Sequence, residues 1–268
     1  MTTSLISDRL VLLDRDDAGV GHLRLNRPDA SNGMNIEFLQ DFHDALVLIN
    51  RTPEIRSVVI TGEGKNFCAG GDVKTFAQQG ESLPAYLREA TDWLQKCSQS
   101  VRQLDAPVIA AVHGFAAGGG GFGLVCAADL VVAAESAKFM TGATRVAMVP
   151  DFGTTALLPQ LVGMRAAMEL VLTNRVLSAS EAMELGIINE VVADAELLPR
   201  AFGLATAIAE GSFAANAAAK HLMWEGIGSA IDTQLAIEAR TVSALGGTAD
   251  AREGLAAVIE RRSPNFDR

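Results

Sequence analysis

Two glycine-rich turns could place backbone N–H groups around one oxygen atom. The first turn, 68–73 (CAGGDV), follows the apolar run 57–61, and the second, 118–123 (GGGGFG), follows the apolar run 108–112 and opens a predicted helix. Free N–H groups at a helix start stabilise negative charge, and glycine lets a ligand approach them closely. The two turns together predict an oxyanion hole, which suits chemistry through an enolate or a tetrahedral intermediate. Two tight turns that bind nothing are the alternative from these residues alone.

The second turn also matches the dinucleotide-binding spacing GxGxxG, at Gly118, Gly120 and Gly123. Only five residues separate Gly123 from Asp129, whereas the helix of a βαβ crossover needs about a dozen. No acidic residue stands near position 143 to hold a ribose. The spacing therefore does not indicate a dinucleotide site.

The composition excludes several classes of protein. The chain has 268 residues, of which 49% are hydrophobic, and 22 Lys and Arg against 32 Asp and Glu give a formal charge of −10. The apolar fraction is enough for a full core, and an acidic chain without a basic run is not typical of a nucleic-acid binder. Three scattered cysteines and four histidines show no metal-ligand or disulfide spacing, so we expect no metal site.

The compartment is predicted from what the sequence lacks. No charged residue occurs between Asp105 and Asp129, but six glycines in that stretch make a poor membrane helix, so we predict a buried strand, loop and helix and no membrane partner. The first residues do not have the pattern of a signal peptide, and we expect a cytoplasmic protein.

Strand and helix patterns alternate as far as residue 198, and only helical patterns follow. We therefore predict an α/β core over residues 1–198 and a helical C-terminal part over residues 199–268. Strands are expected at 11–13, 20–25, 57–61, 108–112, 130–133 and 187–192. Helices are expected at 35–50, 84–104, 122–127, 178–186, 204–211, 213–225, 231–245 and 250–261, and a further helix is expected to start at about residue 153. Segment 136–150 is expected to be irregular.

Five ordered motifs resemble the crotonase (enoyl-CoA hydratase/isomerase) superfamily, and the resemblance covers nearly the whole chain. These motifs are LNRPDASNGMN (25–35), VVITGEGKN followed by FCAGGDV (58–73), VIAAVHGFAAGGGGFGLVCAADL (108–130), AKFMTGATRVAMVPDFGTT (137–155) and ERRSPNF (260–266). The resemblance implies a spiral of ββα units with an α-helical C-terminal part that serves as a trimerisation or lid region. It also implies a homotrimer or a dimer of trimers, and acyl-CoA thioester substrates.

The same resemblance assigns roles to residues of this chain. The N–H of Gly71 would be one oxyanion donor, and the second would be Gly119 or Gly120, depending on the direction of counting. Coenzyme A, present as part of the substrate and with no prosthetic group beside it, would contact Arg27, Ala30, Asn32, Ala69, Asp72 and Lys74. Segment 75–94 and the C-terminal helices would line the acyl pocket.

Departures from the family pattern narrow the expected reaction. The two glutamates that hydratases of the family use fall on Gly123 and Ala143, neither of which can move a proton. Asp151 stands where several relatives carry a carboxylate and resembles the acid/base of enoyl-CoA isomerases of the phenylacetate type, and the C-terminal tail also resembles those isomerases. We therefore predict an isomerase that shifts a double bond with Asp151 alone. The alternatives are a hydratase-like lyase, a dehalogenase of the 4-chlorobenzoyl-CoA type and a non-catalytic acyl-CoA-binding protein.

Asp151 also has a purely structural interpretation. An Asp before Phe152-Gly153-Thr154 suits a helix N-cap, where cap hydrogen bonds and the helix dipole favour the carboxylate form. An apolar acyl pocket would instead raise its pKa. The sequence leaves the balance of these two effects open.

Overall fold

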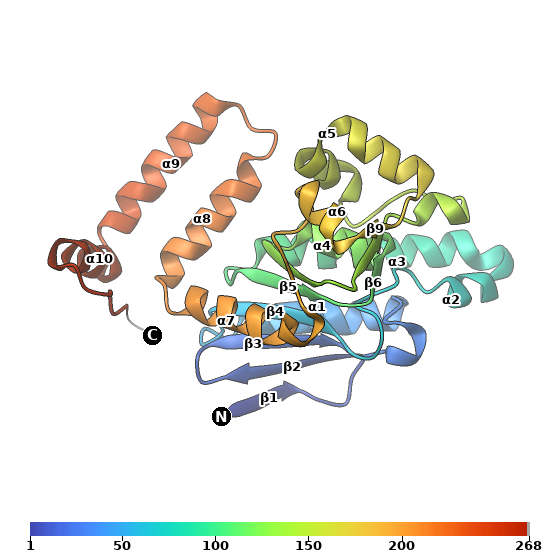
Figure 1. Ribbon diagram of the computed structural model, residues 1–268, viewed down its shortest axis with the longest axis horizontal. Helices are drawn as coiled ribbons and strands as arrows, with labels where there is room; N and C mark the ends of the chain where they lie inside the picture. The colour runs from blue at the N-terminus through green and yellow to red at the C-terminus, as the bar shows by residue number, and fades with distance from the viewer. Residues whose placement is uncertain (267–268) are drawn as a thin grey trace.

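A seven-stranded sheet forms the centre of the fold (Figure 1). In the computed structural model, which describes residues 1–266, the strand order is β1-β2-β3-β4-β5-β7-β10. The first two pairs are antiparallel, and the remaining four are parallel. The strands are β1 (Thr2–Ile6), β2 (Val11–Asp16), β3 (Val20–Leu25), β4 (Ser57–Gly62), β5 (Val108–Val112), β7 (Leu130–Ala134) and β10 (Glu190–Val192).

A second, three-stranded sheet holds the shorter strands. Its order is β6 (Phe115–Ala117), β8 (Lys138–Met140) and β9 (Leu177–Ser178). The strand pairs β5-β6 and β7-β8 each place one strand in the large sheet and one in the small sheet before a helix returns the chain. This order is the predicted spiral of ββα units.

The helices pack on both faces of the large sheet. Val58 and Ile60 of β4 face the layer that contains α1 and α3, whereas Val59 between them faces α7, as the alternation of a strand requires. The α-helices are α1 (Ile36–Asn50), α2 (Val73–Gln78), α3 (Leu83–Gln103), α4 (Leu124–Ala127), α5 (Thr154–Thr173), α6 (Ala179–Glu184), α7 (Leu197–Ala209), α8 (Phe213–Gly226), α9 (Ile231–Gly246) and α10 (Ala249–Glu260).

Local signals explain where several helices begin. The side chain of Asn35 accepts a hydrogen bond from the Phe38 N–H at the start of α1. Ser178 and Glu181 form the predicted capping box at the start of α6. A turn of π-helix over Gly119–Gly123 precedes α4, so the helical region begins three residues before the predicted start at Phe122.

The prediction was wrong for the segment 136–150, which contains strand β8, and it missed strands β1, β6 and β9. Strands β6, β8 and β9 have at most three residues each. Such lengths are too short to show an alternating pattern, and pairing with distant segments stabilises them. Strand β1 lies at the sheet edge and exposes most of its residues, so its sequence has no buried face to reveal it.

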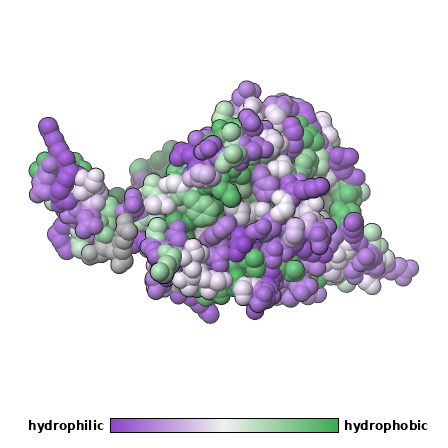
Figure 2. Space-filling model, turned by 60° about the horizontal axis from the view of Figure 1, so that its bottom comes forward, coloured by the Kyte–Doolittle hydropathy of each residue, from purple (hydrophilic) through white to green (hydrophobic). Residues whose placement is uncertain are grey.

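The C-terminal part divides into a packed half and a projecting half. Helix α7 buries Leu197, Ala201 and Ala205 on the sheet, so the predicted boundary at residue 198 falls within a helix of the core. Helix α8 leads away from it, and α9 and α10 project from the body (Figure 1). Figure 2 shows this projection as a separate lobe. Within α9 and α10 only Ala257 is buried.

Helix α5 alone, among residues 1–266, is long and apolar enough to cross a membrane by length and composition. It is not one continuous helix, because Gly163 has φ +76° and ψ 155° and divides it. The break interrupts the backbone hydrogen bonding that a span requires. The absence of a membrane partner stays a prediction.

Candidate active site

The two glycine-rich turns lie against each other. Cys68 and Ala116 form an isolated parallel bridge that joins the turns at their bases. A Cβ atom on Gly118 would lie 3.1 Å from the Gly70 Cα and 3.9 Å from the Gly71 nitrogen. Gly70 and Gly118 both have positive φ, at +96° and +60°, so glycine is needed at both positions for the conformation and for the close approach.

The N–H groups of the predicted oxyanion donors are available. Met34 bonds to the Gly70 carbonyl and to the Asp72 N–H, which leaves the Gly71 N–H between them pointing away from Met34. No acceptor for this N–H occurs among residues 1–266. Gly119 and Gly120 occupy the first helical positions, where an N–H has no acceptor within the helix.

An apolar cavity of about 600 Å³ opens beside these glycines. Its wall includes Gly71, Gly119 and Gly120, and its only charged residues within the described chain are Asp151 and Arg145. Segment 75–94 contributes Phe76, Leu87, Ala90, Thr91 and Leu94 to the wall, as the resemblance implied, whereas the C-terminal helices of the described chain contribute none.

Asp151 lies directly over Gly119. A Cβ atom on Gly119 would be 1.4 Å from Asp151 Oδ1 and 2.6 Å from its Cγ, so only glycine leaves room for this carboxylate. Burial raises the pKa of Asp151 to about 6. A carboxylate with this pKa is poised to accept and return a proton near neutral pH.

The structural interpretation of Asp151 as a side-chain N-cap is wrong. The cap of α5 is Gly153, in the left-handed region at φ +85°, and it makes no side-chain cap hydrogen bond. Asp151 contributes its carbonyl instead, which accepts from the N–H and the hydroxyl of Thr154 at 2.9 and 2.7 Å. The carboxylate therefore has no capping role, and burial decides its pKa.

The two positions where hydratases of the family carry glutamate differ in their surroundings. Ala143 lines the cavity, so a longer side chain there would reach into it. Gly123 has no such space, because a Cβ atom would lie 2.7 Å from the Phe152 Cβ and 2.8 Å from the Thr154 hydroxyl. Neither position supplies a proton-transferring group.

Three of the six predicted coenzyme A contacts are bound into one network. Arg27 pairs with Asp72 at 2.7 Å and donates to the Gly33 carbonyl. Asp72 also accepts from Thr75 and caps α2, and these bonds hold the pKa of its carboxyl below the usual value against the opposing effect of burial. Asn32 is fully buried and donates to three backbone carbonyls of segment 63–67.

The other three predicted contacts are more accessible. Ala69 and Lys74 are exposed beside the first glycine turn, and Ala30 is partly exposed on the adjoining turn. Coenzyme A can therefore reach Ala30, Ala69 and Lys74, whereas the side chains of Asn32 and Asp72 support the loop. The contacts themselves remain predictions.

Cys68 is not a nucleophile. It is fully buried, its thiol donates to the Asn32 carbonyl, and burial raises its pKa to about 12. The neutral thiol is a poor nucleophile, so Cys68 serves packing. His113 bonds to the Gly64 carbonyl at 3.0 Å, a structural role next to the glycine turn.

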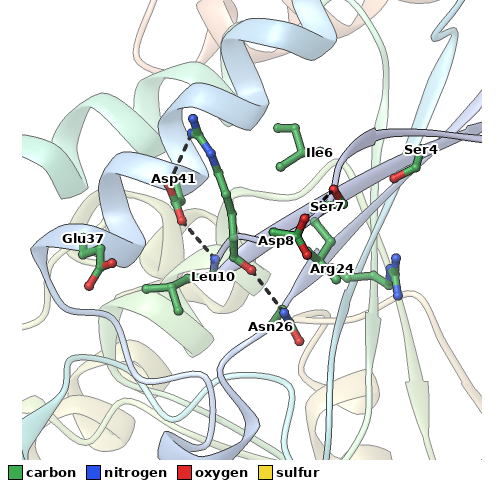
Figure 3. Close-up of a pocket in the computed structure, with 11 residues that line it drawn as sticks. Ser4, Ile6, Ser7, Asp8, Leu10, Arg24, Asn26, Glu37 and Asp41 are labelled. Carbon is green, nitrogen blue, oxygen red and sulfur yellow. Dashed lines mark hydrogen bonds and ion pairs between the residues drawn. The ribbon is translucent and has the colours of Figure 1, made fainter.

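A second cavity of about 570 Å³ lies near the N-terminus and contains none of the predicted site residues (Figure 3). Asp41 accepts from the Leu10 N–H and from Arg9, and the Arg9 carbonyl accepts from Asn26. These contacts tie β2 to α1 and to the end of β3. Among the described residues, no cluster of three or more His, Cys, Asp or Glu could hold a metal ion.

Several residues at this site have no recognisable signal in the sequence. Met34 reaches the face of Gly120, where a Cβ atom would lie 2.7 Å from its sulfur, and the Phe76 ring covers Gly71 in the same way. Ser98 donates to the Phe152 carbonyl from the far side of the Asp151 turn. A buried serine in an amphipathic helix has no sequence signal that separates it from any other small residue.

Comparison with known proteins identifies the family. The family model for enoyl-CoA hydratase/isomerase matches residues 15–268. The crotonyl-CoA hydratase of Syntrophomonas wolfei is 36% identical, with 96% of this chain and 97% of that relative covered. The 1,2-epoxyphenylacetyl-CoA isomerase of Escherichia coli is 35% identical, with 95% of this chain and 97% of the relative covered.

A solved structure indicates the same family as the family model and the two relatives. The enoyl-CoA hydratase of Bacillus anthracis superposes with a TM-score of 0.90 at 34% identity and covers 96% of this chain and 99% of its own. The fold is that of a crotonase-type α/β protein. The chain belongs to the enoyl-CoA hydratase/isomerase family, and it is an enzyme that acts on acyl-CoA thioesters.

Proposed function

We propose that the enzyme moves the double bond of an enoyl-CoA thioester, with Asp151 as its single acid and base. One observation carries this proposal: among the described residues, Asp151 is the only carboxylate that lines the cavity beside the two glycine turns. Hydratase and isomerase relatives are similarly close in identity, so the choice between these reactions rests on the site.

The reaction follows from the position of Asp151 next to the oxyanion donors. The N–H of Gly71 and that of Gly119 or Gly120 would bind the thioester oxygen. The Asp151 carboxylate removes a proton from C2 of a 3-enoyl thioester, and the electron pair spreads over the dienolate to that oxygen. The protonated Asp151 then returns the proton to C4, which leaves the double bond between C2 and C3. One carboxylate is enough for this transfer, and no atom is gained or lost.

The test uses a trans-3-enoyl-CoA in D₂O. We expect the conjugated 2-enoyl thioester to form, with deuterium at C4 only to the extent that the proton on Asp151 exchanges with solvent before it is returned. The Asp151→Asn enzyme should lose about 10²–10⁴-fold in kcat, the usual contribution of general acid–base catalysis. Asp92→Asn is the matched control, because Asp92 is exposed on α3 and outside the cavity.

Other outcomes separate the alternatives. Hydration of a 2-enoyl-CoA without isomerisation would establish the lyase. Chloride release from 4-chlorobenzoyl-CoA would assign Asp151 as a nucleophile, as in a dehalogenase. Tight binding of the thioester without turnover would indicate a binding protein. Each of these results, in place of conjugation, would overturn the isomerase proposal.

We also propose that the enzyme is a homotrimer or a dimer of trimers. The projecting helices expose large apolar side chains, including Ile231, Val242 and Val258, and α5 exposes Met164 and Leu172. Exposed apolar surface of this extent is typical of a protein interface. Light scattering should give three or six times the chain mass of 28.2 kDa, and a monomer would refute the proposal.

A further inference from the structure

The turn that carries Asp151 has an unusual backbone. Phe152 has φ +56°, in the left-handed region that bulky residues avoid, and Gly153 follows at φ +85°. A strained conformation persists only where the surrounding structure imposes it. The contacts of this turn therefore show what keeps Asp151 in place.

Three features hold the turn: the burial of one side chain and the hydrogen bonds of two others. The Phe152 side chain is buried at 3% exposure. The N–H and hydroxyl of Thr154 bond to the Asp151 carbonyl. The hydroxyl of Ser98, which is itself buried on α3, donates to the Phe152 carbonyl at 2.9 Å.

The Ser98 bond is the contact that fixes the peptide after Phe152. No second donor to the Phe152 carbonyl occurs among residues 1–266. Ser98 also lies close to the next residue, since a Cβ atom on Gly153 would be 3.6 Å from its hydroxyl oxygen. Without the hydroxyl, a buried carbonyl loses its partner, and the strained Phe152 backbone loses a restraint.

We infer that Ser98 is a positioning residue for the reaction: its hydrogen bond to Phe152 holds the left-handed turn that keeps the Asp151 carboxylate over Gly119. This inference rests on the proposed role of Asp151 as acid and base. Ser98 does not line the main cavity, and together with Asp151 and Phe152 it borders a smaller cavity of about 220 Å³. Its effect on the reaction is exerted through the backbone of residues 151–153.

The experiment compares Ser98→Ala with Ser98→Thr, which keeps the hydroxyl, and with Ser100→Ala as a control on the same helix. For the trans-3-enoyl-CoA reaction we expect Ser98→Ala to lower kcat by about 10²-fold, because a displacement of about 1 Å costs that much. KM should change little, since Asp151 is the only residue of the cavity wall that we expect to move. Ser98→Thr should recover most of kcat, and Ser100→Ala should match the wild type.

A kcat for Ser98→Ala equal to that of Ser100→Ala would overturn the inference, and so would a loss that appears in KM alone. If Ser98→Ala does not fold, Ser98→Cys decides, because it keeps the volume with a weaker donor. Its kcat should then fall below the wild-type value at unchanged KM, and an unchanged kcat would overturn the inference.

A second readout does not depend on turnover. The carboxyl carbon of Asp151, assigned in the NMR spectrum with Asp151→Asn, gives its titration directly. In Ser98→Ala the carboxyl should titrate at lower pH than in the wild type, because it turns from the apolar wall toward water. An unchanged titration would overturn the positioning role, whereas absence of isomerisation in the wild type with a shifted titration would overturn only the proposed function.

Discussion

The contact between Gly119 and Asp151 allows a sharp test by a single methyl group. A Cβ atom at Gly119 would lie 1.4 Å from Asp151 Oδ1, whereas ordinary contacts begin at 3.4 Å. The carboxylate must therefore move by about 2 Å, the difference between these two distances. Because a displacement of about 1 Å can cost 10²-fold in rate, Gly119→Ala should lose at least that factor in kcat.

The assay is the conversion of trans-3-enoyl-CoA, with thermal unfolding measured in parallel. Gly203→Ala is the matched control, since Gly203 is exposed in α7 and nothing lies within 4 Å of its Cβ position. Its kcat should not change, and it should be more stable by about 1 kcal/mol. Gly120→Ala should disturb Asp151 less, because its Cβ meets the flexible end of Met34.

A Gly119→Ala enzyme with the kcat of the wild type would refute the reasoning. It would show that the carboxylate does not react from its place over Gly119. A protein that unfolds would be distinguished by its melting curve, and retained binding of a CoA thioester would show that the cavity survives. With the fold and binding intact, kcat alone decides.

Two further predictions concern stability. Asp151→Asn should be more stable to urea than the wild type at pH 7.5, by up to about 3 kcal/mol. The Asp151 carboxyl has a pKa of about 6 in the folded protein against an ordinary 3.8, so its charge at pH 7.5 lowers the free energy of unfolding. The difference should close as the pH falls below 4, and a difference in urea midpoints that does not change with pH would contradict the prediction. Lys220→Met should lower the free energy of unfolding by about 3–5 kcal/mol, because the buried ammonium pairs with Asp129 at 2.9 Å and donates to two backbone carbonyls. The control Lys138→Met, at an exposed lysine, should change the urea midpoint little. Equal urea midpoints for the two variants would contradict the prediction.

The sequence was sufficient for the elements that carry their own signals. Helix α1 shows its cap at Asn35 and its apolar spacing, and β4 and β5 are buried β-branched runs. The glycine turns were recognisable because positive φ and close backbone contact restrict those positions to glycine. These features are local, so neighbouring residues are enough to reveal them.

Contacts between distant segments could not be predicted in the same way. For Asp151, helix capping would lower the pKa of the carboxyl and burial would raise it, and only its place in the apolar wall of the cavity shows that burial prevails. Asn32 and Asp72 could be assigned to the ligand from the motif, yet their side chains are bonded within the loops. Ser98 lies 54 residues before the carbonyl that it binds, and no spacing in the sequence records this contact.

The packing around Gly123 fixes the order in which substitutions could accumulate. Hydratases of the family carry a glutamate at this position, but here the Phe152 Cβ and the Thr154 hydroxyl fill the space that its first carbon would need. A glutamate introduced alone would displace the turn that holds Asp151, and so remove the proposed acid before a second one could act. A change from one-carboxylate to two-carboxylate chemistry must therefore reshape residues 151–154 first.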